Sequence, residues 1–266
     1  MAEIHPSAIV SSHARIGTGV RVGPFCVVGD GVELGDGVVL QSHVVVEGRT
    51  RIGARTHIFP FASIGHPPQD MKYAGEPSEL VIGDDNTIRE HVTMNPGTQG
   101  GGMVTRIGSR CLFMMGAHVA HDCAIGDRVV MANNATLAGH VIVEDDAIVG
   151  GLAAVHQFVR IGRLAMIGGM SGVEHDVIPY ALAIGNRACL QGLNLVGLKR
   201  QGLSRDDIQA LKALYDSIFN GEDTLTKRMD ELDERFSAAG PARDVIAFLR
   251  GDSSRALCRP RPGNGG

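Results

Sequence analysis

Residues 119–160 read VAHDCA IGDRVV MANNAT LAGHVI VEDDAI VGGLAA VHQFVR when they are divided into units of six. An aliphatic residue or methionine opens every unit. The same spacing runs from Ile4 to Ile64 and again, after one slip in phase, from Ile107 to Val173. Neither the period of a surface strand nor that of an α-helix produces it. A six-residue period is the signature of a parallel β-helix.

One six-residue unit corresponds to a short strand and a corner, and three units close a triangular coil of eighteen residues. Residues eighteen positions apart then stack at the spacing of neighbouring strands, about 4.8 Å. The apolar residue of each unit points inward, so stacked coils bury one continuous core. Glycine follows this residue in many units, for example at Gly23 and Gly150, and we expect it to supply the backbone angles of the corners. The pattern predicts a mainly β protein built as a parallel β-helix.

The composition excludes several classes of protein. The 266 residues carry a formal net charge of −4, so the chain lacks the basic footprint of a nucleic-acid-binding protein. No apolar run is long enough to span a membrane, and no signal peptide opens the chain. The five cysteines form no CxxC motif, and their scatter is typical of a reducing compartment. We expect a cytoplasmic protein with no integral membrane segment and no nucleic-acid partner.

Two segments interrupt the repeat of a solenoid that is expected to span residues 1–185. Residues 66–79 (HPPQDMKYAGEPSE) replace two units and keep the phase, so they must leave the coil as a projecting loop and return to it. Residues 95–105 (NPGTQGGGMVT) shift the phase by one residue. Loops on a rigid scaffold often carry functional residues, so both segments are candidates for binding.

Helical spacing replaces the repeat in the C-terminal part of the chain. Ser204 is a typical N-cap with acidic residues in the turn that follows, and further helices are expected from about Thr224 and from Pro241. We expect an α-helical C-terminal domain over residues 186–258. It would cover the open end of the solenoid, which otherwise exposes unpaired strand edges. The tail, residues 259–266, is rich in proline and glycine and is expected to be disordered.

Four histidines stand in register with the repeat. The units that contain His121, His140 and His156 start eighteen residues apart, so these side chains are expected on one lateral stretch of three successive coils. His118 ends the preceding unit, at the adjacent corner. Four imidazoles on one patch of surface indicate a functional site rather than scattered solvated histidines.

The residues themselves leave three kinds of site open. A zinc site needs three or four such ligands, yet Ile161 follows His156 at the distance where the hexapeptide carbonic anhydrases place a second histidine. A neutral imidazole can instead act as general base in acyl transfer, removing a proton from a hydroxyl group that attacks a thioester. Asp122 could then orient His121, and Gly139 could offer its backbone N–H to the oxyanion. In the third kind of site, the histidines hydrogen-bond a substrate.

Seven motifs of specific sequence are spread over the whole chain, including its helical part. They are FASIGHPPQDMKYAGEP (61–77), IREHVTMNPGT (88–98), AHVAHDC (117–123), MANNATLAGHV (131–141), AVHQF (154–158), IGGMSGV (167–173) and GLKRQG (197–202). Together they resemble the UDP-N-acetylglucosamine O-acyltransferase family of lipid A biosynthesis. The resemblance implies a left-handed β-helix, a homotrimer with active sites in clefts between subunits, and a cytoplasmic enzyme that uses neither a cofactor nor a metal.

The resemblance also implies a role for each site residue. His121 matches the general base and Gly139 matches the backbone donor of the oxyanion hole, with Asp122 as the candidate orienter. The residues that match contacts with the sugar nucleotide and the acyl chain are Gln69, Asp70, Lys72, His118, His140, His156, Gln157, Asn194 and Arg200.

Two features concern the acyl donor. Gly169 occupies the position of the family's hydrocarbon ruler, where glycine leaves room for a longer acyl chain than a bulky residue would. The acyl-carrier protein of this family is acidic, so basic residues of the C-terminal region are candidates to dock it. These are Lys199, Arg200, Arg205, Arg255, Arg259 and Arg261.

The implied reaction is transfer of an (R)-3-hydroxyacyl chain from acyl-carrier protein to the 3-hydroxyl of UDP-N-acetylglucosamine. The alternative is the same transfer to the 3-amino group of a UDP-diamino sugar. Two departures from the family pattern bear on the acceptor. Asn95 and Pro96 replace a His-Arg pair of the enterobacterial members, and Val196 stands where some members have a glutamate. A metalloenzyme and a non-catalytic solenoid are the other classes, and the second does not explain four histidines in register.

Overall fold

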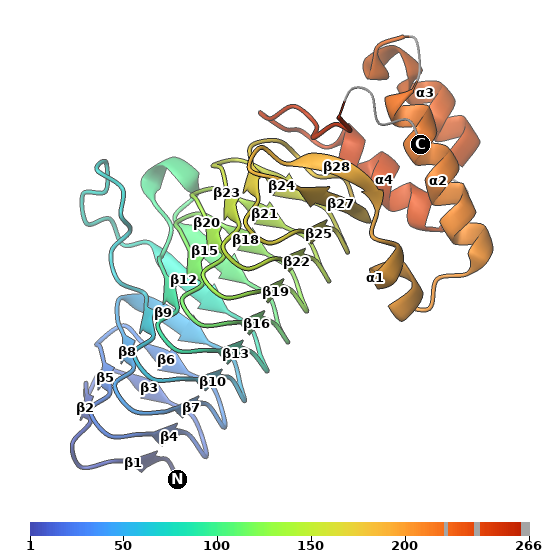
Figure 1. Ribbon diagram of the computed structural model, residues 1–266. Helices are drawn as coiled ribbons and strands as arrows, with labels where there is room; N and C mark the ends of the chain where they lie inside the picture. The colour runs from blue at the N-terminus through green and yellow to red at the C-terminus, as the bar shows by residue number, and fades with distance from the viewer. Residues whose placement is uncertain (221–222, 237–239, 262–266) are drawn as a thin grey trace.

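In the described part of the chain, three β-sheets whose strands are parallel, apart from the last strand of one sheet, form the faces of a triangular prism (Figure 1). The chain passes from sheet to sheet as it winds along the axis. This computed structural model describes residues 1–220, 223–236 and 240–261. Sheet A contains β1 (Glu3–Ile4), β4 (Arg21–Val22), β7 (Val39–Leu40), β10 (His57–Ile58), β13 (Thr87–Ile88), β16 (Leu112–Phe113), β19 (Val130–Met131), β22 (Ile148–Val149), β25 (Met166–Ile167), β27 (Ala181–Ile184) and β28 (Cys189–Leu193). Sheet B contains β2 (Ile9–Val10), β5 (Val27–Val28), β8 (Val45–Val46), β11 (Ser63–Ile64), β14 (Thr93–Met94), β17 (His118–Val119), β20 (Thr136–Leu137), β23 (Ala154–Val155) and β26 (Gly172–Val173). Sheet C contains β3 (Arg15–Ile16), β6 (Glu33–Leu34), β9 (Arg49–Ile52), β12 (Glu79–Ile82), β15 (Val104–Ile107), β18 (Ala124–Ile125), β21 (Ile142–Val143) and β24 (Arg160–Ile161).

The coils repeat with the predicted period of eighteen residues. Val119 pairs with Leu137 on the next coil, and Leu137 pairs with Val155 on the coil after that. The inward residues of the three sheets are nearly all buried and form one hydrophobic core along the prism axis. The predicted parallel β-helix is confirmed, and its ladder fixes the register of every corner.

The glycines that follow the inward residues have a different role from the one expected. Left-handed backbone angles fall three residues after an inward residue, mostly on residues other than glycine, such as Asp122 (φ 59°) and Asp146 (φ 61°). Gly23 and Gly150 do not have left-handed angles. A Cβ atom at either position would lie 2.6 Å from a carbonyl oxygen of the next coil. Glycine is required there because the coils approach closely, not because the backbone turns.

The chain turns at three edges, which we name after the sheets they join: the A/B, B/C and C/A edges. Both insertions leave the prism at the B/C edge. The first loop lies between β11 and β12, and the second lies between β14 and β15 and includes the short 3-10 helix η1 (Gln99–Gly101). In Figure 1 the two loops project from the same side of the prism. The B/C edge is therefore the edge with the most material added to the basic coil.

The coils lead into a mixed C-terminal region. β27 continues sheet A parallel to β25, and β28 then pairs antiparallel with β27. The described residues after β28 contain α1 (Leu195–Arg200), α2 (Arg205–Phe219), α3 (Leu225–Phe236) and α4 (Gly240–Arg250). Ser204 is the N-cap of α2, as the sequence predicted, and it forms a capping box with Asp207. β28 lies within the segment expected to be helical, so strand pairing extends further than the repeat.

Ordered structure also continues past residue 258. The backbone nitrogen of Leu190 in β28 donates to the carbonyl oxygen of Arg259 at 3.0 Å, and Leu190 forms an isolated bridge with Pro260. The first residues of the tail 259–266, which we expected to be disordered, thus add to β28. Residues 262–266 lie outside the described residues. The division into a solenoid of residues 1–185 and a helical domain of residues 186–258 stays a prediction.

Arg160 on β24 connects α4 to sheet C and also forms a buried ion pair. Arg160 Nε lies 2.8 Å from Asp176 Oδ2, and the Asp176 side chain is fully buried. Arg160 Nη2 also donates to the carbonyl oxygen of Phe248 at 3.0 Å, and its guanidinium lies 4.2 Å from the centre of the Phe248 ring. Removing one partner of such a buried pair typically destabilises a protein by about 3–5 kcal/mol. These contacts fix the position of α4 on the last coils.

Candidate active site

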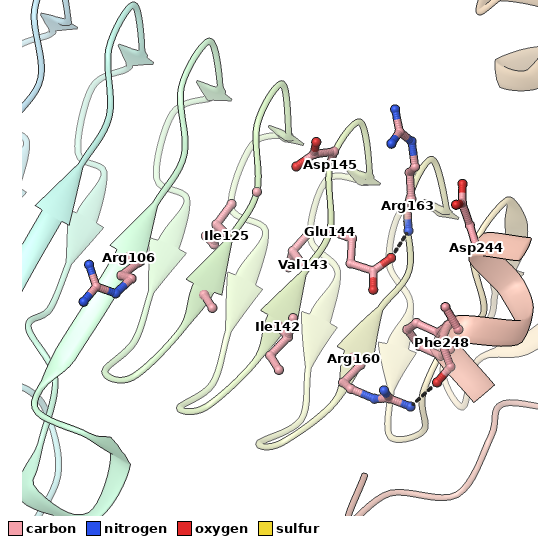
Figure 2. A pocket seen from close by; sticks show the side chains of 13 residues that line it. Arg106, Ile125, Ile142, Val143, Glu144, Asp145, Arg160, Arg163, Asp244 and Phe248 are labelled. Atoms are coloured by element: carbon pink, nitrogen blue, oxygen red, sulfur yellow. Dashed lines mark hydrogen bonds between the residues drawn. The ribbon is translucent and has the colours of Figure 1, made fainter. Parts of the chain in front are cut away.

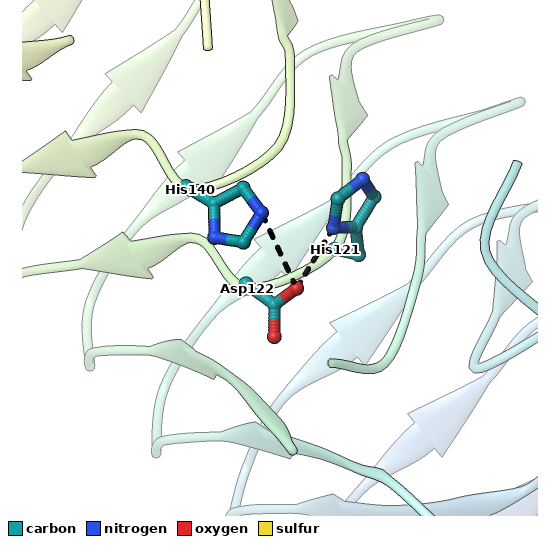
Figure 3. Close-up of side chains that lie close together, drawn as sticks. All are labelled: His121, Asp122 and His140. Carbon is teal, nitrogen blue, oxygen red and sulfur yellow. Dashed lines mark hydrogen bonds and ion pairs between the residues drawn. The ribbon is translucent and has the colours of Figure 1, made fainter. Parts of the chain in front are cut away.

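His121 and Asp122 form the turn of the B/C edge between β17 and β18. His121 Nδ1 lies 2.8 Å from Asp122 Oδ2 (Figure 3). Neighbouring side chains of a strand point to opposite sides, but the left-handed φ of Asp122 turns its carboxylate toward the imidazole. An ionised carboxylate only accepts hydrogen bonds, so Nδ1 must be the donor. Nε2 of His121 is then the free proton acceptor, which is the form that a general base requires.

His140 occupies the same edge one coil further on. Its Nε2 lies 3.8 Å from Asp122 Oδ2, and its ring meets the ring of His121 edge to face with the centres 5.1 Å apart (Figure 3). On the following coil, Phe158 stacks on His140 with ring centres 4.4 Å apart. Burial lowers the pKa of His140, and the charges of Asp122 and Asp70 act in the opposite direction. His140 is therefore neutral at pH 7.

His118 lies on β17, at the start of the same corner. Its Nδ1 is 2.7 Å from the hydroxyl oxygen of Thr93 on the preceding coil. Burial lowers the pKa of His118, and a charge on His121 would lower it further. The site thus holds at least two imidazoles that resist protonation near neutral pH, and both can serve as neutral hydrogen-bonding groups.

Two threonines that the sequence did not single out hold Asp122 in place. Thr98 in the second loop donates its backbone N–H to Asp122 Oδ1 at 2.8 Å and its hydroxyl to Oδ2 at 2.6 Å. Thr105 on β15 accepts a hydrogen bond from the backbone nitrogen of Asp122 at 2.8 Å. The only sequence signal for them was the phase shift at residues 95–105, which marks a loop but does not say what it contacts.

Gly139 lies directly against the ring of His121. A Cβ atom at this position would be 2.4 Å from Cε1 and 2.6 Å from Nε2 of that ring, so no larger residue fits without moving the imidazole. The backbone N–H of Gly139 meets no acceptor among the residues that the structure describes. An unpaired N–H beside a histidine acceptor is the arrangement that an oxyanion hole needs.

The first loop brings three predicted substrate contacts to this edge. Gln69 and Lys72 are exposed, and Asp70 accepts a hydrogen bond from the backbone nitrogen of Lys72 at 3.0 Å. The charge of Asp70 acts to raise the pKa of His140, so this part of the loop lies near enough to interact with it electrostatically. These polar side chains are available to a ligand at the B/C edge.

His156 and Gln157 lie one coil beyond His140 and are exposed. Arg255, from the segment after α4, reaches back to both of them. Its Nη2 lies 2.7 Å from His156 Nδ1, and its Nε donates to the carbonyl oxygen of Gln157 at 2.9 Å. One of the basic residues that we considered for docking the carrier protein thus borders the histidine site.

The remaining predicted residues lie away from the histidines of the same chain. Gly169 is at the A/B edge between β25 and β26, where an added Cβ atom would lie 3.2 Å from the carbonyl oxygen of Gly151. Asn194 caps α1 by accepting from the backbone nitrogen of Gly197 at 3.0 Å, and it donates to the carbonyl oxygen of Leu164 at 3.0 Å. Arg200 ends α1 and is exposed. Within one chain, the structure does not bring these three residues to the histidines.

Asn95, Pro96 and Val196, which depart from the family pattern, lie in different environments. Asn95 is buried and donates from Nδ2 to the carbonyl oxygen of His66 at 3.0 Å, which joins the second loop to the first. Its neighbour Pro96 lines a cavity of about 340 Å³ under the first loop. Val196 is exposed on α1. Asn95 therefore has a structural contact of its own, whereas Val196 has none that ties it to the histidines.

The distances among His121, Asp122 and His140 also raise the question of whether they could bind a metal ion. One ligand atom each from His121, Asp122 and His140 lie within 4.8 Å of one another. A metal ligand must be an unprotonated nitrogen, but His121 Nδ1 uses its proton in the short bond to Asp122. Asp122 Oδ2 also accepts the hydroxyl proton of Thr98. The geometry favours a hydrogen-bonded pair over a metal centre, and a metal-free site stays a prediction.

A cavity of about 660 Å³ lies on a different face, between sheet C and α4 (Figure 2). Ile142 and Phe248 form apolar parts of its wall, and Arg106 and Glu144 are among the charged residues. Burial raises the pKa of Glu144, which accepts a hydrogen bond from the backbone nitrogen of Arg163 at 2.8 Å. No histidine is among the described residues that line this cavity. The chemistry predicted from the sequence belongs to the B/C edge and not to this cavity.

Two family models match the chain. One, described as "Udp N-acetylglucosamine O-acyltransferase; Domain 2", matches residues 176–258. The other, the bacterial transferase hexapeptide of six repeats, matches residues 13–48 and 105–139. The matches cover both the helical region and parts of the coil.

Known proteins resemble the chain over most of its length. An acyl-[acyl-carrier-protein]–UDP-N-acetylglucosamine O-acyltransferase of Paracoccus denitrificans is 56% identical over 206 residues, 77% of each chain. A protein of the same name from Rhizobium johnstonii is 46% identical over 100% of this chain and 97% of its own. The crystal structure of a UDP-N-acetylglucosamine acyltransferase has a TM-score of 0.93 at 45% identity, covering 97% of this chain and 99% of that one.

Proposed function

Since the chain belongs to the UDP-N-acetylglucosamine O-acyltransferase family, we propose that it transfers an (R)-3-hydroxyacyl chain from acyl-carrier protein to the 3-hydroxyl of UDP-N-acetylglucosamine. The protein is an acyltransferase with the fold of a left-handed parallel β-helix and a helical C-terminal region. This transfer is the first step of lipid A biosynthesis. The observation that carries the proposal is the pair of His121 and Asp122 beside the free N–H of Gly139.

His121 acts as the general base in this proposal. Its Nδ1 is committed to Asp122, so Nε2 accepts the proton of the sugar hydroxyl as that oxygen attacks the thioester carbonyl. The attack forms a carbon–oxygen bond, and the tetrahedral intermediate then expels the thiolate of the carrier protein. The proton held by His121 neutralises this leaving group. Base catalysis by a positioned side chain contributes about 10²–10⁴ in rate.

The backbone N–H of Gly139 stabilises the oxyanion of that intermediate. The N–H is fixed by the coil and has no other partner in the described structure, so it need not break a hydrogen bond before it acts. Gly139 also lies against the ring of His121, so the proposed oxyanion donor is next to the proposed base.

Neutral imidazoles and the first loop bind the acceptor. His118 and His140 resist protonation because of burial, so each can hydrogen-bond a sugar hydroxyl or phosphate as a neutral ring. In His118 this falls to Nε2, because Nδ1 already meets the hydroxyl of Thr93. Gln69, Asp70 and Lys72 would close over the sugar nucleotide from the loop. We assign His156 and Gln157 to the same binding surface one coil further along the B/C edge, where Arg255 contacts them.

We propose that a homotrimer completes the site. Gly169 lies at the A/B edge of a chain, and Asn194 and Arg200 follow the last coils, whereas the histidines lie at the B/C edge. If the A/B edge of one subunit faces the B/C edge of the next, the two groups meet, and such a heterologous contact can close into a ring. The A/B edge exposes apolar side chains that a partner would cover. They are Phe25, Phe61, Met115, Leu152 and Met170.

We also infer a cytoplasmic location. Cys26, Cys111 and Cys123 are buried free thiols, and burial raises the pKa of Cys111 to about 11. Unpaired cysteines of this kind are typical of a reducing compartment. Within the described ranges, no helix combines the length and apolar character needed to cross a membrane.

A transfer assay tests the proposed function. UDP-N-acetylglucosamine would be incubated with a set of 3-hydroxyacyl-carrier proteins and with wild type, His121→Ala or His13→Ala, each before and after chelation. His13 is an exposed histidine of the same edge and is the matched control. We expect product from wild type and His13→Ala, no effect of chelation, and a loss of about 10²–10⁴ in His121→Ala. Full activity of His121→Ala would overturn the assignment of the base, and loss of activity on chelation would favour a metal site.

The same assay decides the acceptor. A UDP sugar with a 3-amino group would replace UDP-N-acetylglucosamine, since Asn95, Pro96 and Val196 differ from the family pattern. Product from the amino sugar alone would change the proposal from ester to amide formation. The donor that reacts fastest would give the acyl length that Gly169 permits.

A further inference from the structure

The carboxylate of Asp122 has an unusual set of partners. Its side chain is fully buried, and within the described residues no lysine or arginine lies within ion-pair distance of it. The groups that approach it are His121, His140 and Thr98. A buried carboxylate without a fixed cation depends on hydrogen bonds to remain charged and in place.

Thr98 supplies those hydrogen bonds from both of its polar groups. The backbone N–H binds Oδ1 at 2.8 Å, and the hydroxyl binds Oδ2 at 2.6 Å. Oδ2 is also the oxygen that binds His121 Nδ1, at 2.8 Å. Because one residue holds both oxygens, the carboxylate cannot rotate about its Cβ–Cγ bond without losing a contact. The orientation of the imidazole is therefore set through Thr98.

The loop around Thr98 is closed onto the carboxylate. The carbonyl oxygen of Thr98 accepts from the backbone nitrogens of Gly101, at 3.1 Å, and Met103, at 2.9 Å, which folds the loop into η1. A Cβ atom at Gly101 would lie 2.0 Å from Cγ of Asp122. Backbone thus covers the carboxylate where water would otherwise reach it, and hydrogen bonds are stronger in such a low-dielectric setting.

The second loop is in turn tied to the first. The backbone nitrogen of Gln99, next to Thr98, donates to Glu76 Oε1 at 3.0 Å. This bond and other backbone donors lower the pKa of Glu76, so its carboxylate stays charged near neutral pH. Glu76 therefore connects the first loop, which carries Gln69, Asp70 and Lys72, to the segment next to Thr98.

We propose that Thr98 is a positioning residue of the acyl transfer, which holds Asp122 so that His121 keeps Nε2 free to accept the proton. The proposal rests on the proposed function of His121. Thr98 acts through Asp122 and does not touch the reacting atoms. Its loss should therefore lower kcat and leave the KM for the sugar nucleotide unchanged, and it should have no effect where Asp122 is already altered.

The experiment is a double-mutant cycle of Thr98→Val and Asp122→Asn. Valine keeps the size of threonine and its backbone N–H but lacks the hydroxyl, whereas Thr98→Ser retains the hydroxyl. We expect kcat to fall about 10–100-fold in Thr98→Val and to recover in Thr98→Ser, because small displacements of a catalytic group have effects of that size. In the Asp122→Asn background, Thr98→Val should cause no further loss. Thr18→Val, on an exposed threonine of the C/A edge, is the control and should match wild type.

Several outcomes would overturn the proposal. They are full activity of Thr98→Val, an equal loss in the Asp122→Asn background, or a rise in KM alone. The last two would make Thr98 a support of the loop and not of the base. An inactive wild type would count against the proposed function instead. Imidazole ¹⁵N shifts test the positioning without turnover: we expect one tautomer of His121 in wild type and a mixture in Thr98→Val, and an unchanged tautomer in the variant would also overturn it.

Discussion

Asp122 and Asp146 occupy the same place in the repeat on different edges of the prism. Each stands three residues after an inward valine, and each has a left-handed φ, 59° and 61°. Both side chains are nearly buried, with 0% and 8% exposed. Their partners differ completely. At the C/A edge, Arg128 Nε lies 2.7 Å from Asp146, whereas at the B/C edge the carboxylate meets histidines and Thr98.

The difference shows that the repeat supplies the position of a corner aspartate and that the side chains around it determine its chemistry. The hydrogen bond from Arg128 lowers the pKa of the Asp146 carboxyl group. The negative charge of Asp146 is thus paired with a cation of the coil itself. Asp122 has no such cation in the described structure, so its charge acts on an imidazole. Without an arginine partner in the described structure, the carboxylate of Asp122 can instead orient His121, as proposed above.

The most direct way to break this comparison is to neutralise each carboxylate in turn. Asp122→Asn keeps the size of the side chain, but its amide can donate to His121 and favour the tautomer with a proton on Nε2. We expect kcat to fall by about 10²–10⁴, the value of base catalysis. Asp146→Asn should retain wild-type kcat in the same assay. Equal losses in the two variants would show that both aspartates are scaffold.

Crowding His121 from the other side should have the next largest effect. In Gly139→Ala, the new methyl group would displace the imidazole and the oxyanion donor together, since a Cβ atom there would lie only 2.4 Å from Cε1 of His121. We expect kcat to fall by about 10²–10³, as for the loss of an oxyanion donor. Gly240→Ala is the control, because a methyl group there meets no atom within 4 Å. Similar activity of Gly139→Ala and wild type would remove Gly139 from the site.

Asp146 should matter for stability instead of catalysis. Its pKa is lowered by Arg128, so its contribution is present above the ordinary value of 3.8 and is lost as pH falls through the folded-state pKa. We expect Asp146→Asn to lose about 1 kcal/mol of unfolding free energy at neutral pH, since the head of Arg128 is partly exposed to solvent. Urea unfolding at several pH values would measure it. A difference from wild type that persists at the acid end would contradict this origin.

The smallest expected effect is a change of stability due to His118 and His140, at higher pH than the change due to Asp146. Burial lowers the folded-state pKa of His118 and His140 below the ordinary value of 6.5. The unfolded chain then binds more protons, so stability falls as pH drops below that value and levels off beneath the folded-state pKa. We expect the melting temperature of wild type to decrease from about pH 7.5 to about pH 5.5, and to decrease less in His118→Gln. His13→Gln should behave as wild type, and a flat profile for wild type would contradict the burial of the two histidines.

The six-residue period predicted much of the fold because the position of each inward residue determines which residues pair on the neighbouring coils. Val119, Leu137 and Val155 stack as the spacing required. The Ser204 cap was also readable, since a capping box is local in sequence. The sequence did not predict β28 or the pairing of Leu190 with Pro260, because strand pairing after the last coil does not follow the six-residue period.

The candidate site divides in the same way. His121 and His140 could be placed on one edge from the repeat, and the structure brings their rings together. Thr98 could not be found, since its contact with Asp122 depends on how a loop outside the repeat folds back. The contact of Arg255 with His156 spans 99 residues, and no local pattern encodes it.

The hydrogen bonds that join one coil to the next make the prism a one-dimensional chain of interfaces. β17 lies inside this chain, with β14 on one side and β20 on the other. Fraying spreads inward from the ends of such an array, and an interior coil opens only when two interfaces break. Amide protons around His121 should therefore exchange with solvent among the slowest in the molecule. Heat inactivation would then follow the loss of the central array, after the terminal coils have already begun to exchange.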